Sequence, residues 1–287
     1  MNRIVKKEKL APQINLIKLE VPEITRKAQP GQFVILRIHQ EGERIPMSIA
    51  DLEPEIGLLT IIFQEVGKST VQLGEFQVGD ELCDVVGPLG RPTRIEKYGP
   101  CVCLGGGIGI APIHPIAKAL KKVGNEVISI IGARTKKLLI MEEEMKKISD
   151  ELVVCTDDGS YGFNGFVTQP LSQMLKEGNQ VGFCMVVGPV PMMKAACMVT
   201  QPYGIKTMVS LNPIMIDGTG MCGVCRVTVG GKTKFACVDG PDFDGHQVDF
   251  DELSRRLSMY VKQEKISLDK YSSLTGKSWK KGLKTGN

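Results

Sequence analysis

Hydrophobic residues follow different patterns in successive parts of this chain, and the changes divide it into segments. Over residues 1–97 the apolar positions gather in short runs rich in Val, Ile and Leu, separated by Gly and Pro. Such runs predict the strands of an antiparallel β barrel, with only one short helical turn, at residues 69–73. The clearest runs cover residues 13–21, 31–39, 57–66 and 80–90.

From residue 98 the pattern becomes one of buried strands alternating with amphipathic helices. This alternation predicts βαβ units and a parallel sheet, which makes the segment an α/β domain over residues 98–212. The expected strands are 101–106, 127–132, 151–156 and 182–187, and the expected helices are 113–123, 138–148, 167–176 and one starting at Val190.

The pattern changes again after Asn212. Residues 213–250 form a Gly- and Cys-rich module that contains one expected β-hairpin, over 226–235, with its turn at Gly230 and Gly231. The remaining residues, 251–287, are expected to form one amphipathic helix over 251–262 and a basic, solvated tail. The chain is therefore predicted to contain a barrel, a nucleotide-binding domain and a small cysteine module.

Composition and charge exclude several classes of protein. Of the 287 residues, 42% are hydrophobic and 24% are charged, which is ordinary for a globular protein and unlike a disordered, collagenous or coiled-coil chain. No apolar run reaches the roughly 18 residues of a membrane helix, and no apolar segment follows the basic N-terminus, so we expect a cytoplasmic protein. The net charge is only +4, and no basic stripe carries interleaved aromatics, so neither nucleic acid nor membrane is an expected partner.

The chain has nine cysteines, an odd number that argues against a disulfide framework and favours thiol or metal chemistry. Cys222, Cys225 and Cys237 lie together in the Gly-rich module. The other six are dispersed, mostly in predicted strands, where a free thiol behaves as a small apolar residue. We therefore expect core positions for Cys83, Cys101, Cys103, Cys155, Cys184 and Cys197, and structural roles for His39 and His114.

A glycine-rich turn over residues 105–109 joins the first strand of the α/β domain to its first helix. Glycine lets the backbone approach a pyrophosphate closely, and the N–H groups and dipole of the following helix stabilise its charge. Because the turn stands at the start of a βαβ series, we expect a dinucleotide to bind there. The candidate residues are Gly106, Gly107 and Gly109.

Polar side chains follow the next strands, at the edge where a parallel sheet presents its ligand. Arg134, with Lys136 and Lys137, is suited to dinucleotide phosphates, including the 2′-phosphate of NADP. Asp157 and Asp158 would repel that phosphate and suit a ribose hydroxyl, so the sequence favours NAD(H) without excluding NADP(H). The turn after the fourth strand adds the candidates Gly188 and Pro189.

Two motifs resemble the ferredoxin–NADP reductase family. The turn reads G-G-G-I-G-I-A-P, as in the G-G-G-x-G-x-A-P of those reductases, and Arg44 opens R-I-P-M-S-I-A, which is similar to their R-x-Y-S flavin motif with one extra residue. The resemblance implies that Arg44 holds the flavin pyrophosphate and that Ser48 bonds the isoalloxazine edge. It implies a flavin barrel binding FAD over 1–97, with contacts from Pro46, Met47 and Ile49.

The segment Gly67, Lys68, Ser69 and Thr70 opens the short helical turn of the barrel. Its backbone N–H groups and two hydroxyls could hold the flavin diphosphate. It is not a P-loop, because Ile62 stands where that motif requires glycine. The run G-P-L-G at 87–90 matches the family's turn between the two domains and fits an ordinary hairpin equally well.

The cysteine module resembles the electron-transfer subunits of dihydroorotate dehydrogenase, which hold a [2Fe–2S] cluster by C-x4-C-x2-C…C. Here Asp217 stands at the first cysteine, so we expect Asp217, Cys222, Cys225 and Cys237 as the ligands. Two alternatives stay open. The three cysteines and His246 could bind zinc, or Asp217 could only cap a turn while another group binds iron.

Together these features predict an oxidoreductase subunit in which NADH reduces a flavin and the cluster passes electrons on singly. Within the family, the resemblance is greatest to small subunits of electron-bifurcating NADH-dependent reduced ferredoxin:NADP oxidoreductases, also described as sulfide dehydrogenase subunits. It implies a heterodimer with a larger subunit that carries a second FAD and [4Fe–4S] clusters, and ferredoxin as an indirect partner. The alternatives are a dihydroorotate dehydrogenase electron-transfer subunit and a non-enzymatic, zinc-containing redox sensor.

Overall fold

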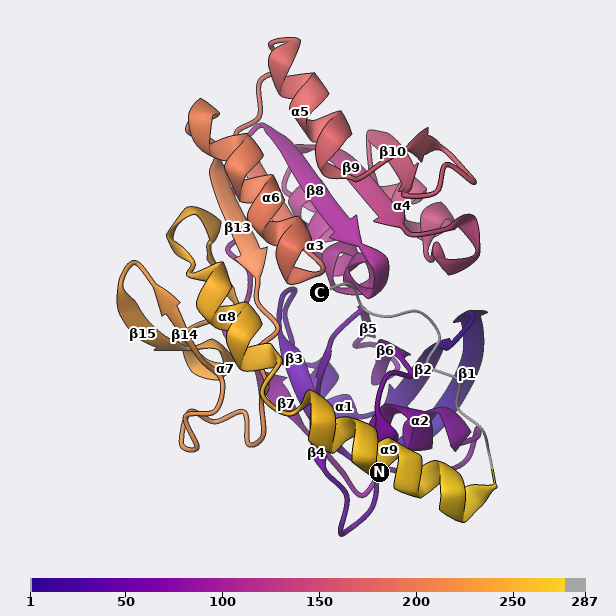
Figure 1. Cartoon of the computed structure of the whole chain (residues 1–287). Helices are drawn as coiled ribbons and strands as arrows, with labels where there is room; N and C mark the ends of the chain where they lie inside the picture. The colour runs from indigo at the N-terminus through magenta and orange to yellow at the C-terminus, as the bar shows by residue number, and fades with distance from the viewer. Residues whose placement is uncertain (1, 277–287) are drawn as a thin grey trace.

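The computed structural model describes residues 2–276, and its N-terminal part consists of two antiparallel sheets packed against each other (Figure 1). One sheet has the strand order β1-β2-β6-β5 and the other the order β4-β3-β7. Alternate residues of both sheets, among them Ile17, Leu36 and Phe63, meet in one buried core. The predicted antiparallel barrel is thus confirmed as two sheets, with strands β1 (Arg3–Ala11), β2 (Ile14–Glu20), β3 (Phe33–Arg37), β4 (Arg44–Ser48), β5 (Asp51–Glu53), β6 (Leu58–Gln64) and β7 (Asp84–Leu89).

Two helices interrupt the strands of the barrel, where the sequence predicted only one turn. α1 (Pro22–Thr25) is a single turn that begins with proline, a residue whose fixed φ suits the first helical position. α2 (Lys68–Glu75) extends the predicted turn at both ends. Its buried residues are Ser69, Val71 and Leu73, and Leu73 joins the core of the barrel.

The α/β domain is built on one seven-stranded sheet with the order β11-β10-β9-β8-β12-β13-β16. All its pairings are parallel except that of β16, which runs antiparallel to β13 at the edge. The predicted parallel sheet is confirmed, and β16 brings a strand from the cysteine module into it. The strands are β8 (Pro100–Gly106), β9 (Glu126–Ala133), β10 (Glu151–Thr156), β11 (Phe163–Asn164), β12 (Phe183–Val187), β13 (Lys206–Ser210) and β16 (Asp242–Asp244).

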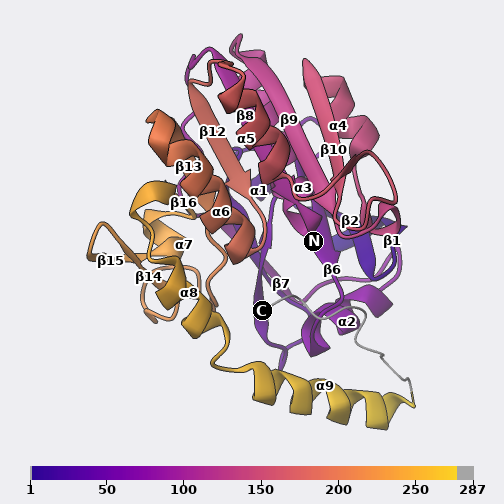
Figure 2. The same ribbon diagram turned by 45° about the horizontal axis from the view of Figure 1, so that its top comes forward.

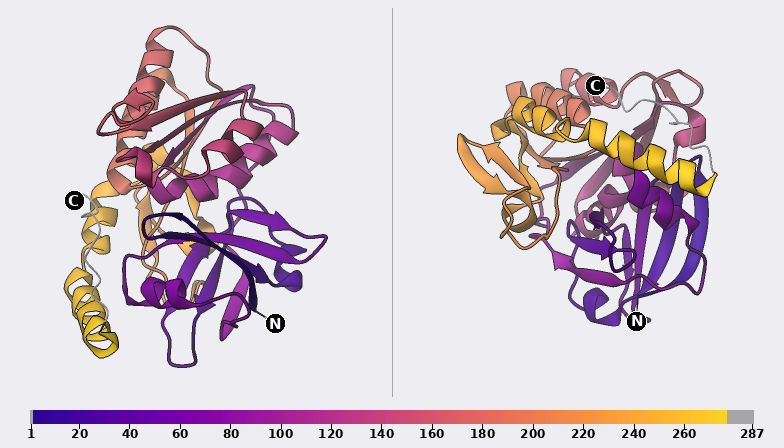
Figure 3. Two further views of the ribbon diagram at one scale, coloured as in Figure 1. Left: turned by 90° about the vertical axis from the view of Figure 1, so that its right-hand side faces the viewer. Right: turned by 60° about the horizontal axis from the view of Figure 1, so that its bottom comes forward.

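Helices cover both faces of this sheet (Figures 1 and 3). α3 (Ile110–Lys122) and α4 (Glu142–Ile148) pack on the face toward the barrel, and α5 (Thr168–Lys176) and α6 (Val190–Thr200) pack on the other. The helix predicted from residue 138 begins later, because Met141 adopts a left-handed backbone at φ 56°. Short 3₁₀ turns lie at η1 (Gly107–Gly109), η2 (Lys136–Leu138), η3 (Gln201–Tyr203) and η4 (Gly245–Gln247).

The cysteine module contains the predicted hairpin, formed by β14 (Arg226–Val229) and β15 (Lys232–Phe235) and followed by α7 (Ala236–Asp239). The single helix predicted over 251–262 is wrong, because the chain turns after α8 (Phe250–Leu257) and forms a second helix, α9 (Val261–Thr275) (Figure 2). Most of the predicted basic tail, 277–287, lies outside the described residues. No described helix is long and apolar enough to cross a membrane.

Buried side chains join the segments to one another. Ala50 and Ile62 of the barrel share a core with α3, and Phe33 and Ile35 share another with the cysteine module and α6. Burial of apolar surface at about 25 cal/mol per Å² makes such shared cores the main force that holds the segments together. The relative placement of the sites described next is therefore fixed by packing.

Five of the six dispersed cysteines lie in these cores, as predicted. Burial raises the pKa of the Cys101 and Cys197 thiols to about 12, so they stay protonated and unreactive. The prediction is wrong for Cys83, which is exposed in the segment before β7. His39 is exposed, whereas His114 is buried, with Nδ1 3.3 Å from the carbonyl oxygen of Ala50.

Candidate redox site

Strand β4 carries the expected flavin motif, and its alternation separates the five candidates into two groups. Arg44, Pro46 and Ser48 point to one face of the strand, where Arg44 and Ser48 are exposed. Met47 packs with the barrel core on the other face, and Ile49 beyond the strand is 1% exposed in the same core. The side chains of Met47 and Ile49 are therefore directed into the core, and the other three candidates share the open face.

The loop before α2 is shaped by its own side chains. The Thr70 hydroxyl accepts hydrogen bonds from Val66 N at 3.0 Å and Gly67 N at 3.1 Å. The Ser69 hydroxyl donates to the carboxylate of Glu43. Both hydroxyls expected on the flavin diphosphate are thus engaged within the protein. The donors left for a phosphate are the N–H groups of the first turn of α2, which have no acceptor inside a helix.

The glycine-rich turn packs tightly against the turn after β12. A Cβ on Gly109 would lie 2.3 Å from the Val187 carbonyl oxygen, and a Cβ on Gly106 would lie 2.3 Å from Met192 Sδ. Gly107 differs, because its φ of +57° suits glycine and the space beside its Cα is open. The two expected phosphate-binding turns are therefore adjacent, with Gly188 part of the same contact.

Helix α3 connects this turn to the flavin strand. Ala50, whose carbonyl oxygen faces His114, comes two residues after Ser48, and Lys118 Nζ lies 3.2 Å from Asp51 Oδ1. Burial lowers the pKa of His114, which favours the neutral ring. The helix that begins at the glycine turn is thus attached directly beyond the residues expected to face the flavin.

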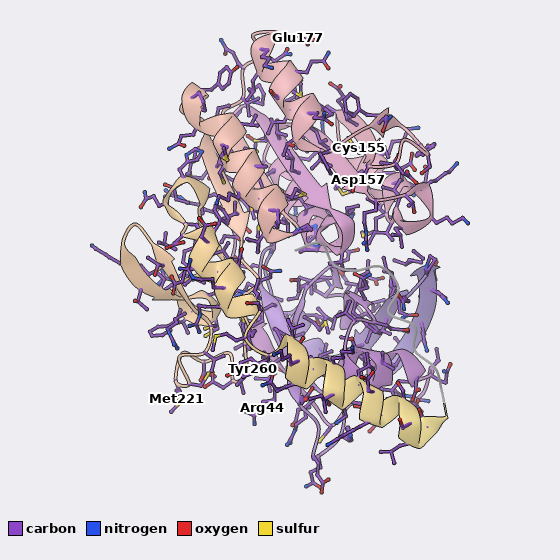
Figure 4. The ribbon with its side chains drawn as sticks, viewed as in Figure 1. Arg44, Cys155, Asp157, Glu177, Met221 and Tyr260 are labelled. Atoms are coloured by element: carbon purple, nitrogen blue, oxygen red, sulfur yellow. The ribbon has the colours of Figure 1, made fainter. Side chains whose placement is uncertain are left out.

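The candidates after β9 and β10 lie side by side at the carboxyl ends of these strands, as Figure 4 shows for Asp157. Asp157 N donates to Ala133 O at 3.1 Å, and Asp158 N donates to Arg134 O at 3.2 Å. Partial burial raises the pKa of Asp157, and the nearby Arg134 guanidinium opposes this effect. The structure therefore brings together the cation and the anion that favour opposite dinucleotides.

A second set of contacts fixes the loop after β10. The Ser160 hydroxyl and then the Ser160 N–H, which donates to the Asp158 carboxylate at 3.0 Å, lower the pKa of Asp158. Lys136 N donates to Ser160 Oγ at 2.9 Å. Lys136 Nζ lies 4.4 Å from the centre of the Tyr161 ring, a cation–π contact. Both Asp158 and Lys136 are thus part of the loop structure.

The cysteine module brings two of its three expected cysteine ligands into contact. Cys225 and Cys237 are buried, and their sulfur atoms lie 3.2 Å apart. Burial, followed by the contact with Cys225, raises the pKa of the Cys237 thiol to about 12. Cys222 lies in the exposed loop before them, whose tip is Met221, 89% exposed (Figure 4).

Asp217 lies at the start of this loop and faces its cysteines. One carboxylate oxygen accepts from Thr219 N at 2.8 Å and the other from Cys222 N at 2.9 Å, and these bonds lower its pKa. The negative charge of Asp217 also raises the pKa of Cys237. The carboxylate therefore both caps the loop and lies close to the thiols.

His246 is engaged elsewhere in the molecule. Its Nε2 lies 3.0 Å from Thr200 Oγ1 on α6, and Thr207 Oγ1 donates to the same hydroxyl at 2.7 Å. Within the described part of the chain, no three His, Cys, Asp or Glu side chains converge on one point as ligands of a single ion must. The bond of His246 to Thr200 therefore disfavours the Cys3His alternative. The ligands of a [2Fe–2S] cluster are divided between two iron atoms, so they need not converge on a single point.

The loop with the cysteines packs directly on the flavin barrel. A Cβ on Gly218 would lie 2.7 Å from Leu89 Cδ1, at the end of β7. Arg91 N donates to Gly240 O at 2.6 Å, and Arg91 Nε donates to Val238 O at 3.0 Å. The segment after G-P-L-G is therefore the barrel's attachment to the cysteine module.

Sequence reasoning missed three residues of this region. Arg91 joins barrel to module, Glu43 accepts from Ser69, and the buried carboxylate of Asp242 accepts from Thr93 Oγ1 at 2.5 Å. Each forms a hydrogen bond with a residue distant in sequence, so no local sequence motif could have predicted it. For Glu43 the only signal is its place beside Arg44.

Comparison with known proteins identifies the segments that this geometry joins. Residues 212–249 match the model of the iron-sulfur cluster binding domain of dihydroorotate dehydrogenase B, and residues 103–198 match that of the oxidoreductase NAD-binding domain. An electron transfer subunit homolog of dihydroorotate dehydrogenase B from Thermotoga maritima is 50% identical, over 97% of this chain and 98% of that protein.

The chain belongs to the dihydroorotate dehydrogenase B electron-transfer subunit family. A subunit of that name from Geobacillus thermodenitrificans is 32% identical over 85% of this chain and 96% of its own length. The family assignment makes the chain an oxidoreductase subunit that transfers electrons, with an NAD-binding domain and an iron–sulfur segment. It excludes the zinc-containing sensor, because the cysteine module is the family's iron–sulfur segment.

Solved structures with a similar fold include one that supports the same family assignment for this electron-transfer subunit. A structure of NADH-dependent reduced ferredoxin-NADP oxidoreductase, from work on flavin-based electron bifurcation, is 50% identical, with a TM-score of 0.90 over 94% of this chain and 98% of that one. An Amycolatopsis cytochrome P450 reductase, 22% identical, has a TM-score of 0.59 over 70% of this chain and 64% of its own, and shares the fold.

Proposed function

We propose that this electron-transfer subunit binds FAD and a [2Fe–2S] cluster and moves electrons between NAD(H) and a larger partner subunit. The contact of Gly218 with Leu89 carries the proposal, because it seats the cysteine loop on the end of the flavin barrel. When bound, the flavin would exchange electron pairs with the nicotinamide and single electrons with the cluster. The proposed segments are the FAD barrel at 1–97, the NAD(H) domain at 98–212, the cluster module at 213–250 and the C-terminal part at 251–287.

The chain's own residues would bind and orient the flavin. Arg44 and Ser48 share the open face of β4, where a guanidinium suits a diphosphate and a hydroxyl suits a ring nitrogen. The first turn of α2, beginning at Gly67, supplies backbone donors for the same diphosphate. Pro46, on the same face, would pack beside the cofactor.

The dinucleotide would lie along the carboxyl ends of β8, β9, β10 and β12. The glycine turn at Gly107 leaves open space for the pyrophosphate, and the Gly188–Pro189 turn borders it. Arg134 would contact a phosphate, and Asp157 would accept from a ribose hydroxyl. Because a carboxylate there disfavours a 2′-phosphate, we propose NAD(H) as the dinucleotide.

Cys222, Cys225 and Cys237 are proposed to hold the cluster, with Asp217 as the fourth ligand. Thiolates are the usual ligands of such clusters, and the 3.2 Å contact between two buried thiols fits ligands that meet around one cluster. Asp217 lies near Cys222 and Cys237, and each of its carboxylate oxygens that accepts an N–H retains a lone pair. Gly218 and Gly220 of this loop have positive φ angles, which let the backbone of the loop wrap closely around a cluster.

The proposed partner is a larger subunit that carries a second FAD and [4Fe–4S] clusters, in a bifurcating complex that handles ferredoxin and NADP(H). The half-identical structure, described as an NADH-dependent reduced ferredoxin-NADP oxidoreductase, supports this choice. The alternative, a dihydroorotate dehydrogenase partner, is favoured by the names of relatives at 32–35% identity.

Purification of the tagged chain from its native cells under anaerobic conditions tests this proposal. We expect about one FAD, two irons and two sulfides per chain, together with a larger protein that contains flavin and iron. Zinc without flavin would contradict the cofactor assignment. Recovery of a dihydroorotate-oxidising subunit in place of the iron-rich one would contradict the proposed partner.

A further inference from the structure

The two C-terminal helices run from the cysteine module to the flavin barrel (Figures 1 and 2). α8 packs against the module, because Phe250 and Leu253 are buried in the core that contains Cys225. Arg256 Nη2 donates to the carbonyl oxygen of Val224 at 3.0 Å. This bond holds the backbone of the cysteine loop one residue before an expected ligand.

α9 crosses the barrel at α2, and only Leu268 of its fifteen residues is buried. The Tyr271 hydroxyl donates to Glu75 Oε2 at 2.7 Å. Burial and the Glu75 carboxylate raise the pKa of Tyr271 to about 12, so the hydroxyl keeps the proton that it donates. The contact therefore combines one apolar anchor with one charge-assisted hydrogen bond.

α2 is held from three sides. Val71 and Leu73 are buried, Leu73 in the barrel core, and Lys7 Nζ donates to Gly74 O at 2.6 Å at its C-terminal end. α9 holds its outer face through Glu75. The N-terminal end of α2 is held by the bonds of Thr70 within its own loop and by the bond from Ser69 to Glu43, and this end supplies the proposed diphosphate donors.

We propose that Tyr271 is a positioning residue for the flavin, acting through Glu75 to fix α2 so that its first-turn N–H groups stay aimed at the diphosphate. Residues 250–275, which we name the C-terminal clamp, would thereby hold the flavin helix at one end and the cysteine loop, through Arg256, at the other. This inference rests on the proposed binding of FAD at α2.

The position of the contact explains why a distant tyrosine would affect the flavin. α2 is only eight residues long, so Glu75 lies at most about 12 Å along the helix from Gly67. A short helix moves as a rigid unit, so loosening its outer face allows the N-terminal donors to tilt. A small loss of alignment weakens several bonds to the diphosphate at once, and the flavin leaves faster.

The rate of FAD release from the full-length holoprotein tests the clamp, followed as the rise in flavin fluorescence after dilution. We expect Tyr271→Phe to release FAD about three- to tenfold faster, with unchanged iron content and an apoprotein melting temperature close to that of the wild type. Glu75→Gln, which keeps an uncharged acceptor, should give an intermediate rate. Tyr203→Phe, at an exposed tyrosine on η3, is the matched control and should match the wild type.

Wild-type release rates in both Tyr271→Phe and Glu75→Gln would overturn the clamp while leaving FAD binding intact. Absence of FAD from the wild-type protein would instead overturn the proposed function. If Tyr271→Phe melts at a much lower temperature, the rate in Glu75→Gln decides, because a wild-type rate there also overturns the proposal.

Discussion

Asp242 combines a buried carboxylate with an incomplete set of hydrogen bonds. One oxygen accepts from Thr93, and among the described residues the other, Oδ1, is buried without a partner. Burial raises the pKa of Asp242 to about 6, although the hydroxyls of Thr93 and Ser210 oppose the shift. Because Thr93 follows the barrel and Asp242 belongs to the sheet edge, the charge lies between two segments of the chain.

Asp242 should make the protein less stable as pH rises. Its folded pKa of about 6 exceeds the ordinary 3.8, so the neutral form is favoured on folding, and this stability, present below pH 4, is lost as pH rises through 6. Two pKa units correspond to roughly 3 kcal/mol as an upper bound. Urea unfolding of Asp242→Asn at pH 8 should therefore show a higher free energy of unfolding than the wild type, with the gap closing at pH 4.5. A constant difference across that range would contradict the assignment.

Asp217 allows a direct test of the proposed cluster ligands. Asp217→Cys should retain the cluster, because a thiolate is a usual iron ligand, and should change its EPR signal and reduction potential. Asp239→Asn is the control, since Asp239 accepts from Phe235 N within the same module and is not a proposed ligand. If the EPR spectrum of Asp217→Cys were identical to that of the wild type, Asp217 would not be an iron ligand and would only cap the loop.

At the scale of elements, the glycine turn of the nucleotide domain leaves no room for an added Cβ at Gly109. Gly109→Ala places a Cβ against the Val187 carbonyl, so the β12–α6 turn must shift. We expect about tenfold weaker NADH binding in a fluorescence titration, with a stability loss of about 1–3 kcal/mol. Gly124→Ala, at φ +86° in open space beyond α3, should cost about 1 kcal/mol and bind NADH normally. Equal affinities would argue against a dinucleotide at this turn.

Periodicity predicted the α/β elements well and the C-terminal part poorly. β10, at Glu151–Thr156, has the predicted bounds, because its run of consecutive apolar residues is typical of a strand in a parallel sheet. α9 was missed because its sequence buries only Leu268, and tertiary contact with α2 decides its position. The sequence named the residues of the flavin motif, but it could not show that the side chains of Met47 and Ile49 face the core while those of Arg44 and Ser48 face outward.

At the scale of the molecule, the cysteine module is integrated with both larger segments. β16 pairs with β13 in the nucleotide sheet, and the cysteine loop contacts β7 of the barrel. The described structure therefore fixes the two proposed redox centres relative to each other by packing and by hydrogen bonds such as that of Arg91 with Gly240. A subunit built in this way can transfer electrons internally without a domain movement.

The most direct test of this account is anaerobic titration of the purified chain with NADH, followed by optical absorbance and low-temperature EPR. We predict that NADH bleaches the flavin band and that the EPR signal of a reduced [2Fe–2S] cluster then appears, in proportion to the iron present. Bleaching of the flavin without an EPR signal, or an unchanged spectrum with NADH, would contradict the proposed path from NAD(H) through the flavin to the cluster.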